Sequence, residues 1–369
     1  MNIHLNRRLV AVAAASALTL GAAWITNGSA AGVNGPTTVV GAVADPTNGA
    51  GVASYAPIVS KVAPAVVTVR SEQRAARGFR SGGGLGSGVI VNANGYIVTN
   101  HHVINGADKV EVELKDRRSF PARVVGSDDA SDLAVLKVEA SNLPALAFGN
   151  SEVVNVGDVV LAFGNPLGVG QTVTMGIISA KGRATGLGDG SFEDFLQTDA
   201  PINSGNSGGA LVNTRGELVG INSQILSPSG GNIGIGFSIP ANMVRAVTDA
   251  LVKDGKVHRG RLGVTVQQVT SDVARGLDLK DIGGALINSV EANGPADRAG
   301  IKPGDVITAL NGQPIADSNE LRNKIAQLGP NARVQLTLVR DGRTQQVAAM
   351  LEELPAAQRA TAQPRRRRE

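Results

Sequence analysis

Short apolar segments separated by turn residues run from Val66 to Ile239, and this rhythm constrains the fold more than any other feature of the chain. The segments recur about every 8–12 residues, a spacing typical of strands in all-β proteins. Residues 89–91, for example, lead through the turn sequence NANG (92–95) into residues 96–98, which is typical of a β-hairpin. Because many strands of similar length follow one another without intervening helices, we predict a β-barrel or β-sandwich.

A serine between glycines lies in this β region, in the sequence GNSGG (205–209). A nucleophilic serine needs a tight turn that exposes its Oγ and directs backbone N–H groups at the developing oxyanion. Glycine permits such a turn and a close approach to the substrate. Taken alone, the pentapeptide is equally compatible with an ordinary turn between two strands.

Two upstream segments supply partners for this serine. Histidine ends an apolar strand in YIVTNHHV (96–103), and aspartate opens another in SDLAVLKV (131–138). The chain order His, Asp, Ser is one of three unrelated orders that build a catalytic triad. Of the four histidines in the chain, only His101 and His102 lie in the β region, so the base for Ser207 is one of these two.

Further short motifs accompany these residues. They are GSGVI (86–90), TNHHV (99–103), DLAVL (132–136), GNP (164–166), GNSGGAL (205–211) and GIGFSIP (234–240). Together they resemble the HtrA/Deg family of serine proteases, over about residues 55–354. The resemblance implies a mainly β fold, in which a chymotrypsin-like double six-stranded β-barrel with its triad in the cleft is followed by one PDZ domain. It also implies a regulatory loop at residues 181–194 and selects His102, directly before valine, over His101.

Each triad residue then has an expected role. Ser207 attacks the peptide carbonyl, and His102 accepts its proton and returns it to the leaving amine. Asp132 holds the imidazole in the required tautomer. Asp128 and Asp129 are rivals for this last role, but they lie in a polar run typical of a solvated turn, whereas Asp132 abuts the apolar strand.

The sequence also suggests how the substrate is held. The backbone N–H groups of Gly205 and Ser207 are the expected oxyanion hole. Asn206 stands where trypsin-like zymogens use aspartate to capture a new N-terminus, so ordering of loops is the expected switch. The segments at residues 200–204 and 223–226 offer no acidic group for a pocket that selects basic side chains. With the family resemblance, this predicts a small apolar pocket lined partly by Ile202 and Ile225, which prefers aliphatic residues.

Residues 260–354 resemble a single PDZ domain. The motifs that carry this resemblance are RLGV (261–264), GPADRAGIKPGDVI (294–307) and LNG (310–312). PDZ domains bind extended C-termini by adding the peptide as a strand at a sheet edge. We expect backbone N–H groups around Leu262, Gly263 and Val264 to hold the terminal carboxylate, and a helix near residues 319–328 to form the other wall. The alternative is a PDZ-like fold that only packs against the protease.

Composition excludes several classes of protein. A chain of 369 residues suggests about two domains. The chain has no cysteine, which excludes disulfides and cysteine-based metal or nucleophile sites. Four scattered histidines without an HExxH pattern argue against a catalytic metal, and we expect no cofactor. The net charge of +4 comes largely from RRRR (365–368), so nucleic-acid binding is not implied.

The N-terminus is typical of an export signal. Two arginines precede an apolar run over residues 9–25, and small residues precede a cleavage site after Ala30. We predict a cleaved periplasmic product; the alternative is a retained inner-membrane anchor facing the periplasm, because about 17 apolar residues approach the lower limit for a span. The expected parts are a signal peptide (1–30), a flexible leader (31–54), a trypsin-like protease domain (55–253), a linker (254–259), a PDZ domain (260–354) and a basic disordered tail (355–369).

These features predict an ATP-independent serine endopeptidase that degrades misfolded or damaged exported proteins. Its expected partners are unfolded protein substrates, C-terminal peptides at the PDZ domain, and further copies of itself in a homotrimer or higher oligomer. One alternative is a membrane-anchored regulatory protease that senses stress. Another is a chaperone or holdase with secondary protease activity.

Overall fold

The computed structural model describes residues 54–74, 80–165, 170–185, 191–227, 231–277, 279 and 282–355. The predicted signal peptide, the leader up to residue 53 and the tail from residue 356 lie outside the described residues. Within the described ranges, the helices are too short or too polar to cross a membrane.

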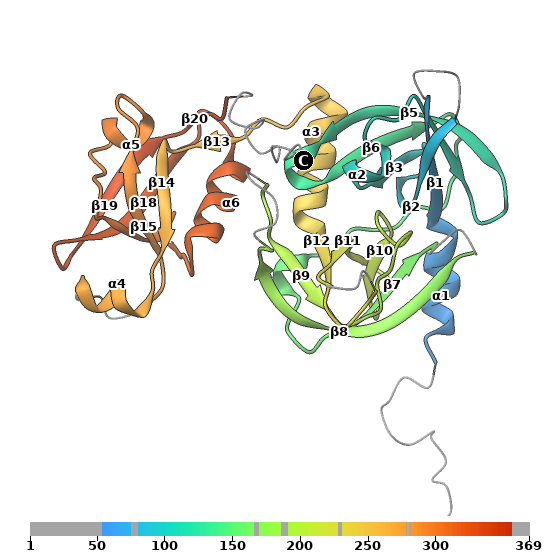
Figure 1. Cartoon of the computed structure of the whole chain (residues 1–369), viewed down its shortest axis with the longest axis horizontal. Coiled ribbons are helices and arrows are strands. Elements are labelled where there is room, and N and C mark those ends of the chain that lie inside the picture. The colour runs from blue at the N-terminus through green and yellow to red at the C-terminus, as the bar shows by residue number, and fades with distance from the viewer. Residues whose placement is uncertain are drawn as a thin grey trace, which may run out of the picture. The chain divides into compact units, whose positions relative to one another are not determined.

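Six antiparallel strands close the first barrel, in the order β1-β2-β3-β6-β5-β4 (Figure 1). They are β1 (Val66–Arg74), β2 (Arg80–Asn92), β3 (Tyr96–Thr99), β4 (Lys109–Glu113), β5 (Ser119–Asp128) and β6 (Leu133–Val138). Alternation places one face inside: in β4, Val110 and Val112 are buried while Lys109 and Glu111 are exposed. The predicted hairpin is confirmed, since β2 and β3 pair across a turn in which Gly95 has a φ of 89°.

The second barrel repeats this design in the order β10-β11-β12-β9-β8-β7. Its strands are β7 (Val159–Gly164), β8 (Thr172–Arg183), β9 (Phe195–Thr198), β10 (Ala210–Asn213), β11 (Leu218–Ile225) and β12 (Gly236–Pro240). Short 3₁₀ helices precede β1 (Ala63–Ala65), connect β5 to β6 (Asp129–Ser131) and lie between β6 and β7 (Ser151–Val153). The expected chymotrypsin-like double barrel is confirmed.

A shared core joins the two barrels. Leu133 from β6, Phe163 from β7 and Phe237 from β12 belong to one buried cluster. The helices α1 (Ala56–Val62) and α3 (Ala241–Asp254) add apolar side chains to it, and α3 contacts β5 and β6 as well as β11 and β12 (Figure 1). This cluster fixes one barrel against the other, so residues from both barrels can contribute to one site.

The C-terminal domain is a sheet in the order β14-β15-β16-β18-β19, with β17 paired to β16. Its strands are β13 (Gly260–Arg261), β14 (Val264–Gln268), β15 (Ala285–Val290), β16 (Val306–Leu310), β17 (Gln313–Pro314), β18 (Arg333–Arg340), β19 (Arg343–Met350) and β20 (Glu352–Glu353), and β13 pairs with β20. Its helices are α4 (Ser271–Gly276), α5 (Pro295–Arg298) and α6 (Ser318–Leu328). Asp317 caps α6 by accepting a hydrogen bond from the Glu320 N–H at 2.8 Å. Because β14 ends the sheet, its outer edge is open to an added strand.

Candidate active site

The loop that carries Ser207 lies between β9 and β10 of the second barrel and is tied to the first barrel. Ser87 of β2 donates its N–H to the Ser207 carbonyl at 2.8 Å and its hydroxyl to the Gly205 carbonyl at 2.7 Å. Gly208 has a φ of 82°, and a Cβ there would collide with the Ser87 carbonyl and the Thr99 hydroxyl. Glycine at this position is therefore required by backbone conformation and by space.

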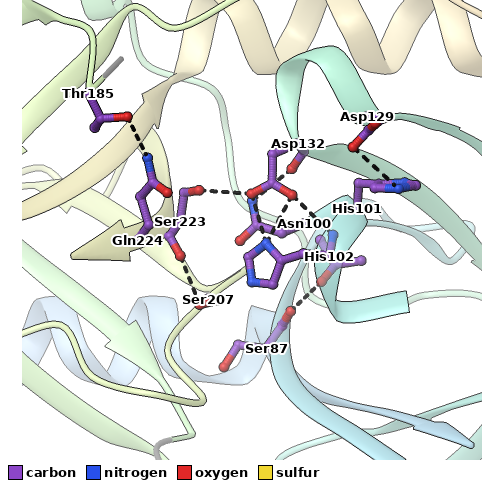
Figure 2. Close-up of polar contacts among 11 residues, drawn as sticks. Ser87, Asn100, His101, His102, Asp129, Asp132, Thr185, Ser207, Ser223 and Gln224 are labelled. Atoms are coloured by element: carbon purple, nitrogen blue, oxygen red, sulfur yellow. Dashed lines mark hydrogen bonds and ion pairs between the residues drawn. The ribbon is translucent and has the colours of Figure 1, made fainter. Parts of the chain in front are cut away.

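His102 and Asp132 meet beside this loop. His102 belongs to the helix α2 (His101–Ile104), and its Nδ1 lies 2.9 Å from each carboxylate oxygen of Asp132 (Figure 2). The His102 N–H also donates to Asp132 Oδ1 at 3.0 Å. Asp132 has a φ of 54°, which is uncommon for a residue other than glycine. Its carbonyl accepts from the Asn100 side chain at 2.9 Å, which helps to hold this conformation.

Ser223 of β11 contacts both halves of the site, and sequence reasoning did not find it. Its hydroxyl donates to Asp132 Oδ2 at 2.8 Å, and its carbonyl accepts from Ser207 Oγ at 2.9 Å (Figure 2). Within the described part of the chain, Ser207 Oγ makes no hydrogen bond to His102. The structure thus brings Asp132 and His102 together, while the Ser207 hydroxyl is hydrogen-bonded to the Ser223 carbonyl. A rotation about χ1 of Ser207 would break this hydrogen bond.

Two backbone amides of the serine loop are available to a substrate oxygen. The N–H groups of Asn206, Gly208 and Gly209 donate to carbonyls of the protein at 2.8–2.9 Å. Those of Gly205 and Ser207 find no acceptor among the residues that the structure describes. These two amides are the ones that the sequence suggests for the oxyanion hole.

His101 lies outside this arrangement. Its Nε2 is 3.6 Å from Asp129 Oδ1, and its ring points away from Ser207 (Figure 2). Asp129 is largely exposed, so this contact occurs at the surface.

The expectation that Asp128 lies in a solvated turn is wrong. Asp128 is 9% exposed and accepts two hydrogen bonds from the Arg259 guanidinium, at 2.7 and 2.5 Å. Ser131 adds donors from its N–H and its hydroxyl. Burial by itself raises the pKa of the Asp128 carboxyl, but the hydrogen bonds and charge of Arg259 and the Ser131 donors outweigh it and lower the pKa below 3.8. Arg259 is 131 residues away along the chain, so no local pattern could reveal the pair.

The two isoleucines expected in the substrate pocket pack in the same cluster of the second barrel. Ile202 is 1% exposed, and Ile225 on β11 is partly buried against that cluster. Ile202 also approaches Gly236 of β12, where a Cβ would lie 3.0 Å from Ile202 Cδ1. This region of the barrel is therefore apolar.

A cavity of 440 Å³ lies where the sequence predicts a peptide groove, and Ala130 and Phe192 of the protease domain also line it. Leu262, Gly263 and Val264 line it, together with Leu321 and Ile325 of α6. In the described ranges, the N–H groups of Leu262 and Gly263 have no acceptor. Two free amides thus lie beside a cavity whose lining includes apolar side chains and the charged residues Arg261, Glu291 and Arg322.

Asp194, just before β9, gives the protein a pH-dependent stability. Burial, followed by the negative charges of Glu152, Glu320 and Asp317, raises its pKa to about 6, although Lys181 opposes this effect. The same five groups line one cavity. Because the folded-state pKa lies above the unfolded value near 3.8, this group makes stability fall as the pH rises from about 4 to about 6, and stability stays lower above that range.

We therefore expect Asp194→Asn to raise the melting temperature at pH 7.5 by several degrees and to change it little at pH 4.5. Thermal unfolding followed by circular dichroism at the two pH values tests this. An equal effect of the substitution at both pH values would show that the carboxylate is not destabilised in the folded protein.

Comparisons with known proteins agree with this architecture. Residues 86–221 match the trypsin-like peptidase domain, and residues 260–351 match the PDZ domain. A probable periplasmic serine protease do/HhoA-like of Haemophilus influenzae is 44% identical over 352 residues, which cover 84% of this chain and 76% of the relative. The periplasmic pH-dependent serine endoprotease DegQ of Escherichia coli is 44% identical over 320 residues, covering 81% of this chain and 70% of DegQ.

A longer relative and a solved structure extend this similarity. The periplasmic serine endoprotease DegP of Escherichia coli is 48% identical over 261 residues, and the match spans 55% of its length. The solved structure of the HtrA-type protease AlgW with a tripeptide superposes with a TM-score of 0.71 at 45% identity, covering 82% of this chain and 98% of that one. With a trypsin-like double barrel followed by a PDZ domain, and with relatives at this level of identity, the chain belongs to the HtrA family and is a serine endoprotease.

Proposed function

We propose that this protein is an ATP-independent periplasmic endopeptidase that degrades misfolded or damaged exported proteins by an acyl-enzyme mechanism. The observation that supports it best is the contact of His102 Nδ1 with the Asp132 carboxylate at 2.9 Å, next to the loop that carries Ser207. That contact leaves the other imidazole nitrogen to act as the base. The names of the related periplasmic serine proteases support the compartment.

In the proposed mechanism, Ser207 Oγ leaves the Ser223 carbonyl and turns to His102 Nε2. Oγ attacks the peptide carbonyl as its proton passes to Nε2, and the resulting oxyanion is bound by the N–H groups of Gly205 and Ser207. The imidazolium protonates the amine as the C–N bond breaks, and water then hydrolyses the acyl-enzyme by the same base. Asp132 keeps its negative charge throughout and stabilises the imidazolium.

Substrate selection is proposed to occur at two places. The first is a small pocket lined partly by Ile202 and Ile225, which would accept aliphatic side chains. The second is the PDZ groove, where Leu262, Gly263 and Val264 would bind a C-terminal carboxylate while the peptide extends along the open edge of β14. The solved structures of AlgW with a tripeptide and with a decapeptide are consistent with peptide binding in this family.

We further infer that the protease domains form a trimer and that residues 1–30 are removed on export. Sedimentation of the purified protein tests the first inference. Mass determination of the mature N-terminus tests the second, and a chain that begins at Ala31 would contradict a retained membrane anchor.

The decisive experiment is cleavage of an unfolded, casein-like protein by the exported enzyme, with and without peptides that end in an apolar residue. We expect cleavage by the wild type and stimulation by the peptides. The Ser207→Ala variant is the blank, and it is also tested for suppression of aggregation. Absence of cleavage under all conditions, with aggregation still suppressed, would contradict the protease function and support a holdase.

A further inference from the structure

The hydroxyl of Ser87 is buried beside the loop that carries Ser207 and has two partners (Figure 2). Its Oγ lies 2.7 Å from the Gly205 carbonyl oxygen and 2.9 Å from the Asn165 backbone nitrogen. The Asn165 N–H can only donate, so it uses a lone pair of Oγ, and the single hydrogen of the hydroxyl is left for the Gly205 carbonyl. Asn165 is itself anchored to β1, because its Nδ2 donates to Thr68 Oγ1 at 2.7 Å. The direction of the hydrogen bond to Gly205 is therefore fixed by the surroundings.

Gly205 depends on this hydrogen bond for its conformation. It has a φ of 97°, and glycine adopts positive and negative φ about equally readily. Because it has no side chain, it can be held only through its peptide groups. Within the described part of the chain, its carbonyl accepts from the Ser87 hydroxyl alone, and its N–H is one of the two amides available to an oxyanion. The Ser87 hydroxyl therefore holds the residue that directs this N–H.

Ser207, which supplies the second amide, is held in a different way. Its carbonyl accepts from the backbone N–H of Ser87 at 2.8 Å, and the next N–H, of Gly208, donates to the Asn222 carbonyl at 2.8 Å. These contacts use backbone atoms only. A change of the Ser87 side chain therefore spares the anchors of the Ser207 amide and removes the anchor of Gly205.

We propose that the Ser87 hydroxyl is a positioning group for the oxyanion hole, which keeps the Gly205 N–H directed at the substrate oxygen by binding the Gly205 carbonyl. This inference rests on the proposed acyl-enzyme mechanism, in which the N–H groups of Gly205 and Ser207 bind the oxyanion. The negative charge develops only after the substrate is bound. Loss of the hydroxyl should therefore lower kcat and leave KM nearly unchanged.

The first measurement is cleavage of a chromogenic peptide by the full exported chain carrying Ser87→Ala. We expect kcat to fall about 10–100-fold, approaching the loss for one missing oxyanion donor, with KM within about twofold of the wild type. Ser151→Ala is the matched control. It removes a serine hydroxyl that is also buried in the protease domain, but this hydroxyl accepts from the Asn242 N–H at 3.1 Å and has no contact with the serine loop. Its kcat should stay within about twofold of the wild type.

The second measurement separates positioning from a general loosening of the fold. A peptidyl trifluoromethyl ketone inhibits by addition of Ser207 Oγ to its carbonyl carbon, while the Oγ proton passes to His102 Nε2 and the carbonyl π electrons form the alkoxide of the hemiketal. That alkoxide occupies the oxyanion hole. The corresponding peptidyl alcohol binds without this bond. We expect Ser87→Ala to raise the Ki of the ketone by the factor that it removes from kcat/KM, and to leave the Ki of the alcohol within about twofold.

A second variant protects the test against a folding defect. Ser87→Cys keeps a side chain of similar shape but replaces the hydroxyl with a weak donor, so its kcat and ketone Ki should fall between those of the wild type and Ser87→Ala. Thermal unfolding of each variant establishes that it is folded at the assay temperature.

The possible failures are distinguishable. If kcat and the ketone Ki of the folded Ser87 variants stay within about threefold of the wild type, Ser87 does not position the oxyanion hole, and the mechanism stands. Equal weakening of the ketone and the alcohol would also overturn the positioning role. If the wild type is not inhibited by the ketone, or if Ser207→Ala still cleaves the peptide, the proposed mechanism fails and the role of Ser87 fails with it.

Discussion

Asp132→Asn is expected to lower kcat for peptide cleavage about 10⁴-fold without unfolding the protein. Asp132 accepts from His102 Nδ1 at 2.9 Å, so it keeps the proton on that nitrogen and leaves Nε2 free to act as a base. An asparagine can present its NH₂ group to Nδ1 instead. The imidazole proton then resides on Nε2, which cannot accept the proton of Ser207.

Steady-state cleavage of a chromogenic peptide with an aliphatic residue before the scissile bond measures this loss. Ser207→Ala gives the floor, about 10⁶-fold below the wild type. Ser223→Ala is the matched control, because it removes one hydrogen bond to the same carboxylate, and we expect a loss of only about tenfold. If Asp132→Asn retained activity within tenfold of the wild type, Asp132 would not orient the base.

Arg259→Ala is expected to destabilise the protein by about 3–5 kcal/mol, the usual cost of leaving one member of a buried ion pair without its partner. The side chains of Arg259 and Asp128 are 5% and 9% exposed. The 3₁₀ helix Asp129–Ser131 joins Asp128 to Asp132. Loss of the ion pair is therefore also expected to disturb the position of Asp132. Combining Arg259→Ala with Asp128→Asn should restore part of the stability, because the uncompensated buried charge is removed.

Urea unfolding measured over a range of pH tests this prediction. The pKa of Asp128 is lowered from 3.8 in the folded wild type, so the stabilisation is present above pH 3.8 and is lost as the pH falls through the folded-state pKa. Arg259→Ala should remove that acid-dependent loss. Arg215→Ala breaks an exposed pair with Glu217 and should change stability far less. Similar losses in the two variants would show that the buried pair contributes no more than a surface contact.

The elements that local patterns define could be predicted from the sequence. Runs of apolar residues marked the strands, as in the segment 131–138, where the structure has β6 (Leu133–Val138). Apolar residues at the spacing of one helix face, such as Met243, Val244 and Val247, are buried in α3, which ends at a left-handed Gly255. Short motifs predicted that His102 and Asp132 are partners, and the imidazole of His102 does contact the carboxylate of Asp132.

Contacts between distant residues could not be predicted. The carboxylate of Asp128 looked solvated because its partner Arg259 enters from another part of the chain. Ser223 carries no motif, and only the path of β11 through the second barrel brings its hydroxyl to Asp132. The hydrogen bond of Ser207 Oγ to the Ser223 carbonyl is a choice of rotamer, which depends on the packed environment and not on sequence spacing.

The contacts of Ser87 also make proteolytic activity depend on the folding of both barrels. His102 and Asp132 come from the first barrel and Ser207 comes from the second, while Ser87 joins the serine loop to β2 through the carbonyls of Gly205 and Ser207. A chain in which only one barrel has formed holds either a base without a nucleophile or a nucleophile without a base. A chain that is still being synthesised or translocated therefore cannot cleave nearby proteins. It becomes an active protease only after both barrels have folded.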